Sequence, residues 1–443
     1  MRRTRHFVFL ALSVLFADSG TRAQQPAQQT IKREQRALVD GMLTNIHEAL
    51  KRNYYDSSFH GLNVDARYKE YSERIKKAET LGDAFRVVAA YLSGLNDSHT
   101  FFVPPRRSYI ADYGYRMQMV GDACYVTEVR PGSDAEQRVH PGDQIIFLDG
   151  YAISRDDLWQ LDYYLNQIAP KPMTGMTVRS PSGETRKVVI ATKYTKREKH
   201  SVMSGARDTD FWSQKLERER EQHLLHQRFV EQGDVLFWKM PAFAVEESEV
   251  DRMIRIARTH KTLILDLRGN PGGYVTTLSH LLGSVMDHDV TIGTRVMRKG
   301  QKPGIAKSRG NNNLFTGHLI VLVDSKSASA AEVFARVVQL EHRGTVVGDR
   351  SSGSVMESLY YPFDDYSGVL VFYGAFITNA DLIMADGKSL EKFGVTPDLL
   401  LLPSALQLAT GEDPVLAKAA QLSGVNLDAV EAGKLFPFEW APE

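Results

Sequence analysis

The sequence predicts an α/β protein in which a helical N-terminal region and a small β-rich domain precede a layered βα domain. Residues 262–268 and 319–323 are short apolar runs suited to buried strands, and a helical pattern follows each of them. A strand, a crossover helix and a second strand imply an α/β layered domain. Residues 124–129 alternate in polarity between Pro-Gly and Asp-Gly turns, which favours an antiparallel β domain.

The composition excludes several classes of protein. The chain has 443 residues, above the roughly 250–300 residues at which one hydrophobic core stops growing, so we expect several domains. The 43% hydrophobic and 24% charged residues exclude a mostly disordered chain, a collagen-like repeat and a polytopic membrane protein. Basic and acidic residues both number 54, so the whole chain has no basic footprint for nucleic acid. The single cysteine, Cys124, excludes an intramolecular disulfide and any Cys-rich zinc or iron–sulfur site.

The N-terminus has the pattern of a signal peptide. Arginines among residues 2–5 precede an apolar run over residues 7–17, and the stretch around Thr21 to Ala23 offers a small-residue cleavage site. This run is too short to cross about 30 Å of hydrocarbon as a helix, and no later stretch approaches the length of a membrane span. The sequence therefore predicts an exported protein, periplasmic or secreted, without a membrane span after cleavage. An uncleaved N-terminal anchor is the alternative.

The remaining elements follow from periodicity and turn signals. Residues 31–95 have helical periodicity, which ends at Asn96 and Asp97. A mixed-charge run over residues 213–228 is typical of a solvated connecting helix. The predicted order is a signal peptide (1–23), an N-terminal helical region (24–106), a small β domain (107–197), a connecting helix (198–233), the βα domain (234–403) and a C-terminal helical cap (404–443).

Residues 319–340 combine a strand, a turn and the start of a helix, where a reactive serine could be held. The apolar strand ends at Asp324, and a helix begins at Ala330, which places Ser329 at the helix N-terminus. Free N–H groups and the helix dipole favour negative charge there, so Ser329 could be a nucleophile and the Ala330 N–H could bind an oxyanion. Ser329 and Glu332 also have the spacing of a capping box, and this segment alone favours that structural interpretation.

The Gly-rich stretch over residues 266–273 lies at the carboxyl end of a predicted strand in the same domain. Active sites of open α/β sheets lie at that edge, and adjacent glycines let backbone N–H groups approach a reacting atom. We expect Gly272 to be the second oxyanion donor, with Gly273 as the alternative. Taken alone the stretch is a Gly-rich turn, and it fits neither nucleotide-binding loop pattern.

Three ordered motifs resemble those of the C-terminal processing (tail-specific) serine peptidases. Residues 265–273 and 327–332 are similar to that family's two signature segments, and residues 386–398 are similar to its closing motif. The resemblance covers most of the chain. It implies a crotonase/ClpP-like catalytic core of stacked βα units in which Ser329 is the nucleophile.

The small β domain resembles a PDZ domain in residues 129–135 and 141–150. PDZ domains capture a peptide C-terminus by strand addition, and loop N–H groups hold its carboxylate. The resemblance implies that Gly114 and Tyr115 bind substrate in this way. Another small β-barrel would fit the same pattern, and a PDZ fold need not bind a chain terminus.

One departure concerns the catalytic base. The best-known branch of these peptidases uses a Ser–Lys dyad, and alignment through Gly348 puts Ser354 at the lysine position. No lysine occurs between Lys326 and Lys388, and a serine cannot serve as the neutral amine base. Either the protein is catalytically inactive or it uses another base.

Residues 97–100 resemble a segment of the tricorn-like branch of the same superfamily, in which a Ser–His pair precedes the PDZ-like region. This resemblance implies that His99 is the general base, Ser98 its neighbour and Glu391 the orienting carboxylate. Because an imidazole titrates near neutrality, it could accept the Ser329 proton and later donate it to the leaving amine.

The sequence therefore predicts an exported serine endopeptidase that acts on polypeptides through an acyl-enzyme and uses no cofactor or metal. No nucleic-acid partner is expected. A catalytically inactive binding or scaffold protein on the same fold is the alternative. A crotonase-like acyl-transfer enzyme has no acyl-CoA feature in the sequence to support it.

Overall fold

The computed structural model describes residues 30–196, 228–366 and 370–440 of the chain. The predicted signal peptide lies outside these residues, as does most of the predicted connecting helix. Its last part, Arg228–Gln232, is not helical but forms strand β10, which pairs antiparallel with β11 (Val235–Lys239). Phe229 and Val230 of β10 pack against buried clusters on the two faces of the core sheet, and this tertiary packing outweighs the mixed charge of the preceding run.

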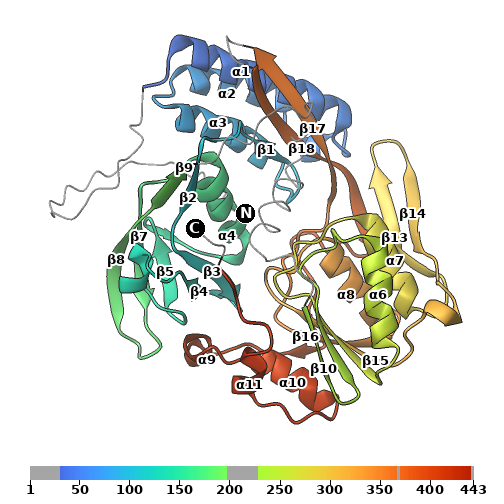
Figure 1. Ribbon diagram of the computed structural model, residues 1–443. Coiled ribbons are helices and arrows are strands. Elements are labelled where there is room, and N and C mark those ends of the chain that lie inside the picture. Colours follow the sequence, from blue (N-terminus) through green and yellow to red (C-terminus); the bar gives the residue numbers. More distant parts are fainter. Residues whose placement is uncertain (1–29, 197–227, 367–369, 441–443) are drawn as a thin grey trace.

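The N-terminal region is helical, as its periodicity predicts. It contains α1 (Arg33–Asn53), α2 (Val64–Lys76) and α3 (Leu81–Ser93). These helices cover the upper part of a sheet built on β17 (Glu357–Tyr366) and β18 (Leu370–Met384), as Figure 1 shows. No helix among the described residues is long and apolar enough to cross a membrane.

Residues 109–196 form a small β-rich unit, called the inserted β domain below. Its main sheet has the order β3-β4-β5-β7-β8, so β3 is an edge strand of that sheet. The elements are β2 (Tyr109–Asp112), β3 (Tyr115–Val120), β4 (Ala123–Val129), η2 (Asp134–Gln137), β5 (Gln144–Leu148), β6 (Tyr151–Ala152), α4 (Arg155–Tyr163), η3 (Tyr164–Ile168), β7 (Met173–Arg179), β8 (Thr185–Ala191) and β9 (Lys193–Lys196).

The C-terminal half is an α/β domain of three layers, which confirms that the protein belongs to the predicted α/β class. A six-stranded sheet has the order β10-β11-β12-β15-β16-β19 and is parallel from β11 onward. One apolar cluster packs its first face against α6, α7 and α8, and another packs the second face against α10 and α11. The remaining bounds are α6 (Glu247–Ala257), β12 (Thr262–Asp266), α7 (Val275–Val285), β13 (Val290–Met297), β14 (Gln301–Ala306), β15 (His318–Val323), α8 (Ala330–Leu340), β16 (Gly344–Gly348), β19 (Leu399–Leu400), α9 (Ala405–Thr410), α10 (Pro414–Leu422) and α11 (Ala429–Gly433).

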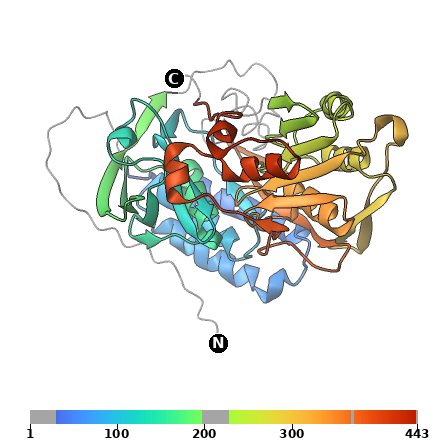
Figure 2. The ribbon, with the colours of Figure 1, turned by 90° about the horizontal axis from the view of Figure 1, so that it is seen from below.

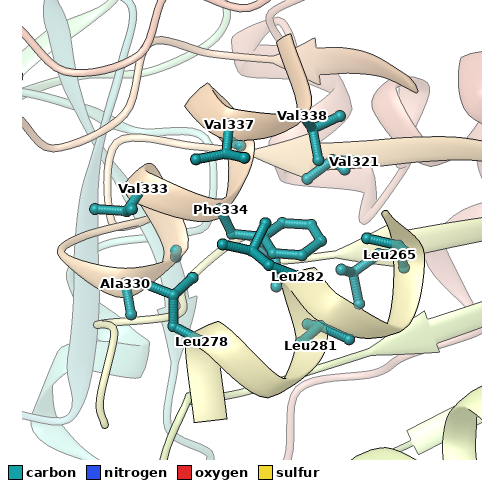
Figure 3. Packing of buried hydrophobic residues seen from close by; sticks show 14 of the residues in the cluster. Leu265, Leu278, Leu281, Leu282, Val321, Ala330, Val333, Phe334, Val337 and Val338 are labelled. Atoms are coloured by element: carbon teal, nitrogen blue, oxygen red, sulfur yellow. The ribbon is translucent and has the colours of Figure 1, made fainter. Parts of the chain in front are cut away.

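Helix α8 is held in place by a dense apolar contact. Its buried face includes Val333, Phe334 and Val337, and Figure 3 shows Phe334 beside Leu282 of α7. Close-packed interiors resist small displacements, so this contact fixes the position of the α8 N-terminus.

Strand β18 joins the two largest buried cores. Its first part contributes Tyr373 and Ile377 to the core beneath the N-terminal helices, and its last part contributes Leu382 and Met384 to the core of the α/β domain. The short strand β1 (Phe101–Val103) pairs antiparallel with β18. The chain before β1 is thereby placed near the α/β domain.

The inserted β domain is fixed to the α/β domain by a polar contact and lies beside it in Figures 1 and 2. The Arg155 guanidinium forms an ion pair with Asp349 and donates to the carbonyls of Gly121 (2.6 Å) and Arg350 (2.9 Å). The Gly121 N–H donates to the same carboxylate (2.9 Å).

The C-terminal segment also contacts the inserted β domain. Phe438 and Trp440 pack edge to face against each other, and two arginines, one in β3 and one directly after β4, lie over their rings. The Arg116 guanidinium carbon is 4.9 Å from the Phe438 ring centroid, and that of Arg130 is 4.4 Å from the Trp440 centroid. This segment therefore connects the helical cap to the inserted domain.

Candidate active site

Ser329 lies on a sharp turn between β15 and α8. Its backbone has φ 54° and ψ −120°, a conformation that side-chain-bearing residues rarely adopt. The Ser329 N–H donates to the Ser354 carbonyl (2.8 Å) and to Glu332 Oε2 (3.0 Å). A strained strand-to-helix turn of this kind exposes a serine hydroxyl at the top of a sheet.

The Gly-rich stretch and the serine turn are bonded to each other because β12 and β15 are neighbouring parallel strands. The Gly269 N–H donates to Asp324 Oδ1 (2.9 Å), and the Ala328 N–H donates to the Asn270 carbonyl (2.9 Å). The carboxyl ends of the two strands thus meet at one edge of the sheet, as the sequence predicts.

Gly272 lies directly against the serine turn. A Cβ added at Gly272 would be 2.6 Å from Ser329 Cβ and 2.9 Å from the Ala330 nitrogen, so a side chain does not fit there. The Gly272 N–H, however, donates to Asn270 Oδ1 (2.8 Å), so the expected second oxyanion donor is engaged in this structure. Among bonds between described residues, the N–H groups of Ala330 and of the alternative donor Gly273 have no acceptor.

Ser98 links Glu391 to the His99 ring. The Ser98 hydroxyl lies 2.7 Å from His99 Nδ1 and donates to Glu391 Oε2 (2.9 Å), and the Ser98 N–H donates to Glu391 Oε1 (2.8 Å). Because a hydroxyl carries one hydrogen, Ser98 accepts a bond from Nδ1–H of His99. This tautomer leaves a lone pair on Nε2, the nitrogen that would act as base. Glu391 and His99 are therefore linked through the Ser98 hydroxyl.

Asp97 fixes the turn that carries His99. Its buried Oδ1 accepts bonds from the N–H groups of His99 (2.9 Å) and Thr100 (2.6 Å) and from Thr378 Oγ1 (3.0 Å), while Oδ2 accepts the Tyr54 hydroxyl (2.8 Å). Sequence reasoning treats Asp97 only as a helix end. An Asp shortly after the end of a helix commonly accepts bonds from the N–H groups two and three residues later, as in an Asx turn. The position of Asp97 in the sequence could therefore have indicated this role.

Glu391, Ser98 and His99 are called the relay below. Burial sets the charge states of its two titratable groups. It lowers the pKa of His99 well below its ordinary 6.5, and the Asp97 carboxylate opposes this shift only in part. It raises the pKa of Glu391, while hydrogen bonds from the Val355 N–H and from Ser98 act in the opposite direction. At neutral pH the imidazole is therefore uncharged and able to accept a proton.

Glu332 organises the loop that faces the serine turn. It is fully buried, and it accepts bonds from Ser351 Oγ (2.6 Å), the Gly353 N–H (2.7 Å) and the Ser354 N–H (2.9 Å), besides that of Ser329. Burial raises the pKa of Glu332 to about 7. The spacing of Ser329 and Glu332 predicts the bond between them, but the bonds to the loop could not be read from spacing.

Ser354, at the predicted lysine position, has its hydroxyl 2.9 Å from Ser352 Oγ. Its carbonyl accepts the Ser329 N–H, and the next residue, Val355, donates its N–H to Glu391 Oε2 (3.0 Å). Two consecutive residues thus connect the serine turn to the relay. Among the described residues, no hydrogen bond joins Ser329 Oγ to the His99 ring.

Gly114 and Tyr115 lie at the start of β3 in the inserted β domain. The Gly114 N–H donates to Asp112 Oδ1 (2.8 Å), so the expected carboxylate donor already has an acceptor. Gly114 has φ 73°, and a Cβ added there would be 2.5 Å from Ser133 Cβ. The backbone conformation and the contact with Ser133 therefore require glycine at position 114, independently of any role in binding a peptide.

Comparison with known proteins identifies the α/β domain. The model of Peptidase family S41 matches residues 234–401. Residues 234–401 therefore form a peptidase family S41 domain. This finding confirms the family resemblance predicted from the three sequence motifs.

The similarity of the chain to curated relatives extends beyond that domain. It is 26% identical over 357 residues to a tail-specific protease of Haemophilus influenzae, covering 75% of this chain and 48% of the relative. It is 24% identical over 401 residues to tricorn protease homolog 2 of Streptomyces coelicolor, covering 84% of this chain and 31% of the relative. A chloroplastic C-terminal processing peptidase of Tetradesmus obliquus is 24% identical and covers 81% and 76% of the two chains. The chain thus spans half or less of the first two relatives.

Solved structures share the fold of the chain. Mature CPAF has a TM-score of 0.63 at 16% identity, covering 85% of this chain and 94% of that one. The photosystem II D1 C-terminal processing protease has a TM-score of 0.51 at 20% identity, covering 92% and 100%. At these identities the likeness concerns the fold alone.

A cavity of about 580 Å³ lies beside the Glu391, Ser98 and His99 relay. Asp97 and Glu391 form part of its wall together with His60, Met356 and Asp381. Neither Ser329 nor His99 lines it. No group of three or more His, Cys, Asp or Glu side chains in the described part of the chain is arranged to hold a metal ion.

Proposed function

We propose that the protein is a serine endopeptidase in which Ser329 is the nucleophile and His99 the general base. The observation that carries this proposal is the relay from Glu391 through Ser98 to His99, which leaves Nε2 of the ring as the proton acceptor. The relay supports a base other than the missing lysine, and the turn at Ser329 supports an exposed nucleophile.

The proposed reaction follows from these positions. Ser329 Oγ attacks the peptide carbonyl, and His99 Nε2 takes its proton and then gives it to the leaving amine. Water hydrolyses the acyl-enzyme with His99 again as the base. The reaction requires Ser329 Oγ and Nε2 to come within hydrogen-bond reach, and such contacts commonly tighten only when substrate is bound.

The N–H group of Ala330, at the start of α8, would be one donor to the oxyanion. Gly272 would be the second donor after release from Asn270, and Gly273 is the alternative whose N–H has no acceptor among the described residues. Removal of one such donor typically costs about 10²–10³-fold in kcat.

The substrates we propose are polypeptides, in keeping with the names of the relatives. The inserted β domain would act as a PDZ-like module that binds a peptide along β3, the edge strand of its sheet. The N-terminal pattern of basic and apolar residues supports export to the periplasm or the exterior.

The experiment that tests this proposal is digestion of an unfolded polypeptide by purified full-length protein. Wild type should cleave it, whereas Ser329→Ala and His99→Ala should each lower turnover by about 10⁴-fold. Exposed His318, at the start of β15, offers a matched control, and His318→Ala should cleave normally. Binding of the polypeptide without cleavage by wild type would instead favour the non-catalytic binding protein.

A further inference from the structure

The turn that precedes Ser329 also contacts the inserted β domain. Gln118 Nε2 of β3 donates to Asp324 Oδ2 (2.7 Å), and Ser325 Oγ donates to the Met119 carbonyl of β3 (2.5 Å). The strand proposed to bind peptides is therefore joined directly to the nucleophile's turn. Lys326 lies between these contacts and Ser329.

Lys326 is a half-buried lysine without a counter-ion. Among the described residues its ammonium forms neither a hydrogen bond nor an ion pair, whereas Lys239 of β11, which is also half-buried, is paired with Asp266. Burial and the positive charge of Arg116 lower the pKa of Lys326. A half-buried ammonium that is left unpaired is costly, and a carboxylate arriving beside it would relieve that cost.

The nearby carboxylates do not neutralise Lys326. Asp324 accepts bonds on Oδ1 from three backbone N–H groups and on Oδ2 from Gln118. Asp162 of α4 is exposed and accepts a bond from Asn166. Glu128 lies on β4, and its burial raises its pKa to about 7, so much of it is uncharged near neutrality. A counter-ion for Lys326 therefore has to come from a group other than these three carboxylates.

We propose that Lys326 is a specificity residue that binds a carboxylate of the polypeptide substrate lying along β3. A peptide added to the edge of β3 would pass the turn over residues 324–326 on its way to Ser329. Lys326 precedes the nucleophile by three residues, so the carboxylate would be held close to the scissile bond. This inference rests on the proposed peptidase function. The carboxylate is either an acidic side chain or the substrate's chain terminus.

The test compares peptide substrates that differ only in charge. In the first pair one peptide has Glu and the other has Gln at the same position, and this position is moved in steps around the cleavage site. In the second pair one peptide ends in a free carboxylate and the other in an amide. Wild type should cleave the acidic member of one pair about tenfold better in kcat/KM, through KM, as expected for a charge-assisted hydrogen bond. The pair that shows the preference identifies the source of the carboxylate. Equal cleavage within both pairs by wild type overturns the proposal.

Variants then assign the preference to Lys326. Lys326→Met should abolish it and Lys326→Arg should retain most of it, while Lys69→Met, on the exposed face of α2, should leave it intact. Preference that persists in Lys326→Met overturns the proposal. Labelling of Ser329 by a fluorophosphonate distinguishes failure of the Lys326 proposal from failure of the proposed peptidase function. Absence of labelling in wild type refutes the peptidase function itself. If Lys326→Met is not labelled, Lys326→Gln takes its place.

Discussion

At the residue scale, Ser98 lies between the Glu391 carboxylate and the His99 ring and determines which ring nitrogen is protonated. Ser98→Ala removes both side-chain bonds but leaves the backbone bond from residue 98 to Glu391. We expect kcat to fall about 10–100-fold, as for other groups that orient a functional histidine, with KM little changed. Steady-state kinetics measure kcat for Ser98→Ala and for His99→Ala, whose expected loss is larger, about 10⁴-fold. A Ser98→Ala enzyme as active as wild type would refute the relay.

The pH dependence of activity reports the charge of His99. In the proposed mechanism the uncharged ring is the active form, and burial lowers the pKa of His99 below 6.5. The active form therefore persists to lower pH than for an unperturbed histidine, and the acid limb of kcat/KM should have its midpoint below pH 6.5. Initial rates in overlapping buffers between pH 4 and 8 measure this limb. A midpoint above pH 6.5 would mean that the ring gains a stabilised positive charge in the free enzyme.

The sequence identifies the residues of the relay but not their order of contact. Ser98, His99 and Glu391 are found through family resemblance, since the glutamate is 293 positions from the serine. Whether a carboxylate reaches an imidazole directly or through a hydroxyl depends on distances set by the pairing of β1 with β18. A motif does not encode such distances.

At the scale of elements, Glu332 connects α8 with the loop over residues 351–354. Glu332→Gln replaces one oxygen by an NH₂ group, so two of the four donors around it lose their acceptor. We expect the free energy of unfolding to fall by about 1–3 kcal/mol and kcat to fall at least tenfold, because the loop that holds the Ser329 N–H is displaced. Denaturant titration and kinetics measure the two effects.

Glu341 provides the matched control for this prediction. It follows α8 at its other end, where its partner is the exposed His288. Glu341→Gln should change stability by less than about 1 kcal/mol and leave kcat unaffected, since exposed ion pairs contribute little. Equal effects of the two substitutions would show that the bonds from Glu332 to the loop over residues 351–354 contribute nothing specific to stability or kcat.

Periodicity predicts the strands and helices around the site because β12, β15 and α8 are buried by apolar residues of regular spacing. It fails at Arg228–Gln232, where strand pairing decides the conformation of a segment with ambiguous polarity. It also fails to show that the Gly272 N–H is bonded to Asn270, because that bond depends on the shape of one turn.

At the scale of the whole molecule, Arg155 sets the position of the inserted β domain relative to the α/β domain that carries Ser329. Arg155→Ala leaves the buried Asp349 carboxylate without its cation. We expect a loss of about 3–5 kcal/mol in the free energy of unfolding, and a higher KM for long polypeptides because β3 is no longer held beside the serine turn. Arg138→Ala, which breaks an exposed ion pair with Asp134, should cost less than about 1 kcal/mol. An unchanged KM in Arg155→Ala would argue that the inserted domain has no part in substrate binding.

The most direct test of the whole account is the reaction of the full-length protein with a fluorophosphonate, followed by mass spectrometry of the labelled peptide. We predict a single label on Ser329, absent from Ser329→Ala, and formed at least about 10³-fold more slowly by His99→Ala because the serine then lacks its base. A label on another serine, or a rate in His99→Ala equal to that of wild type, would contradict the assignment of the nucleophile and its base.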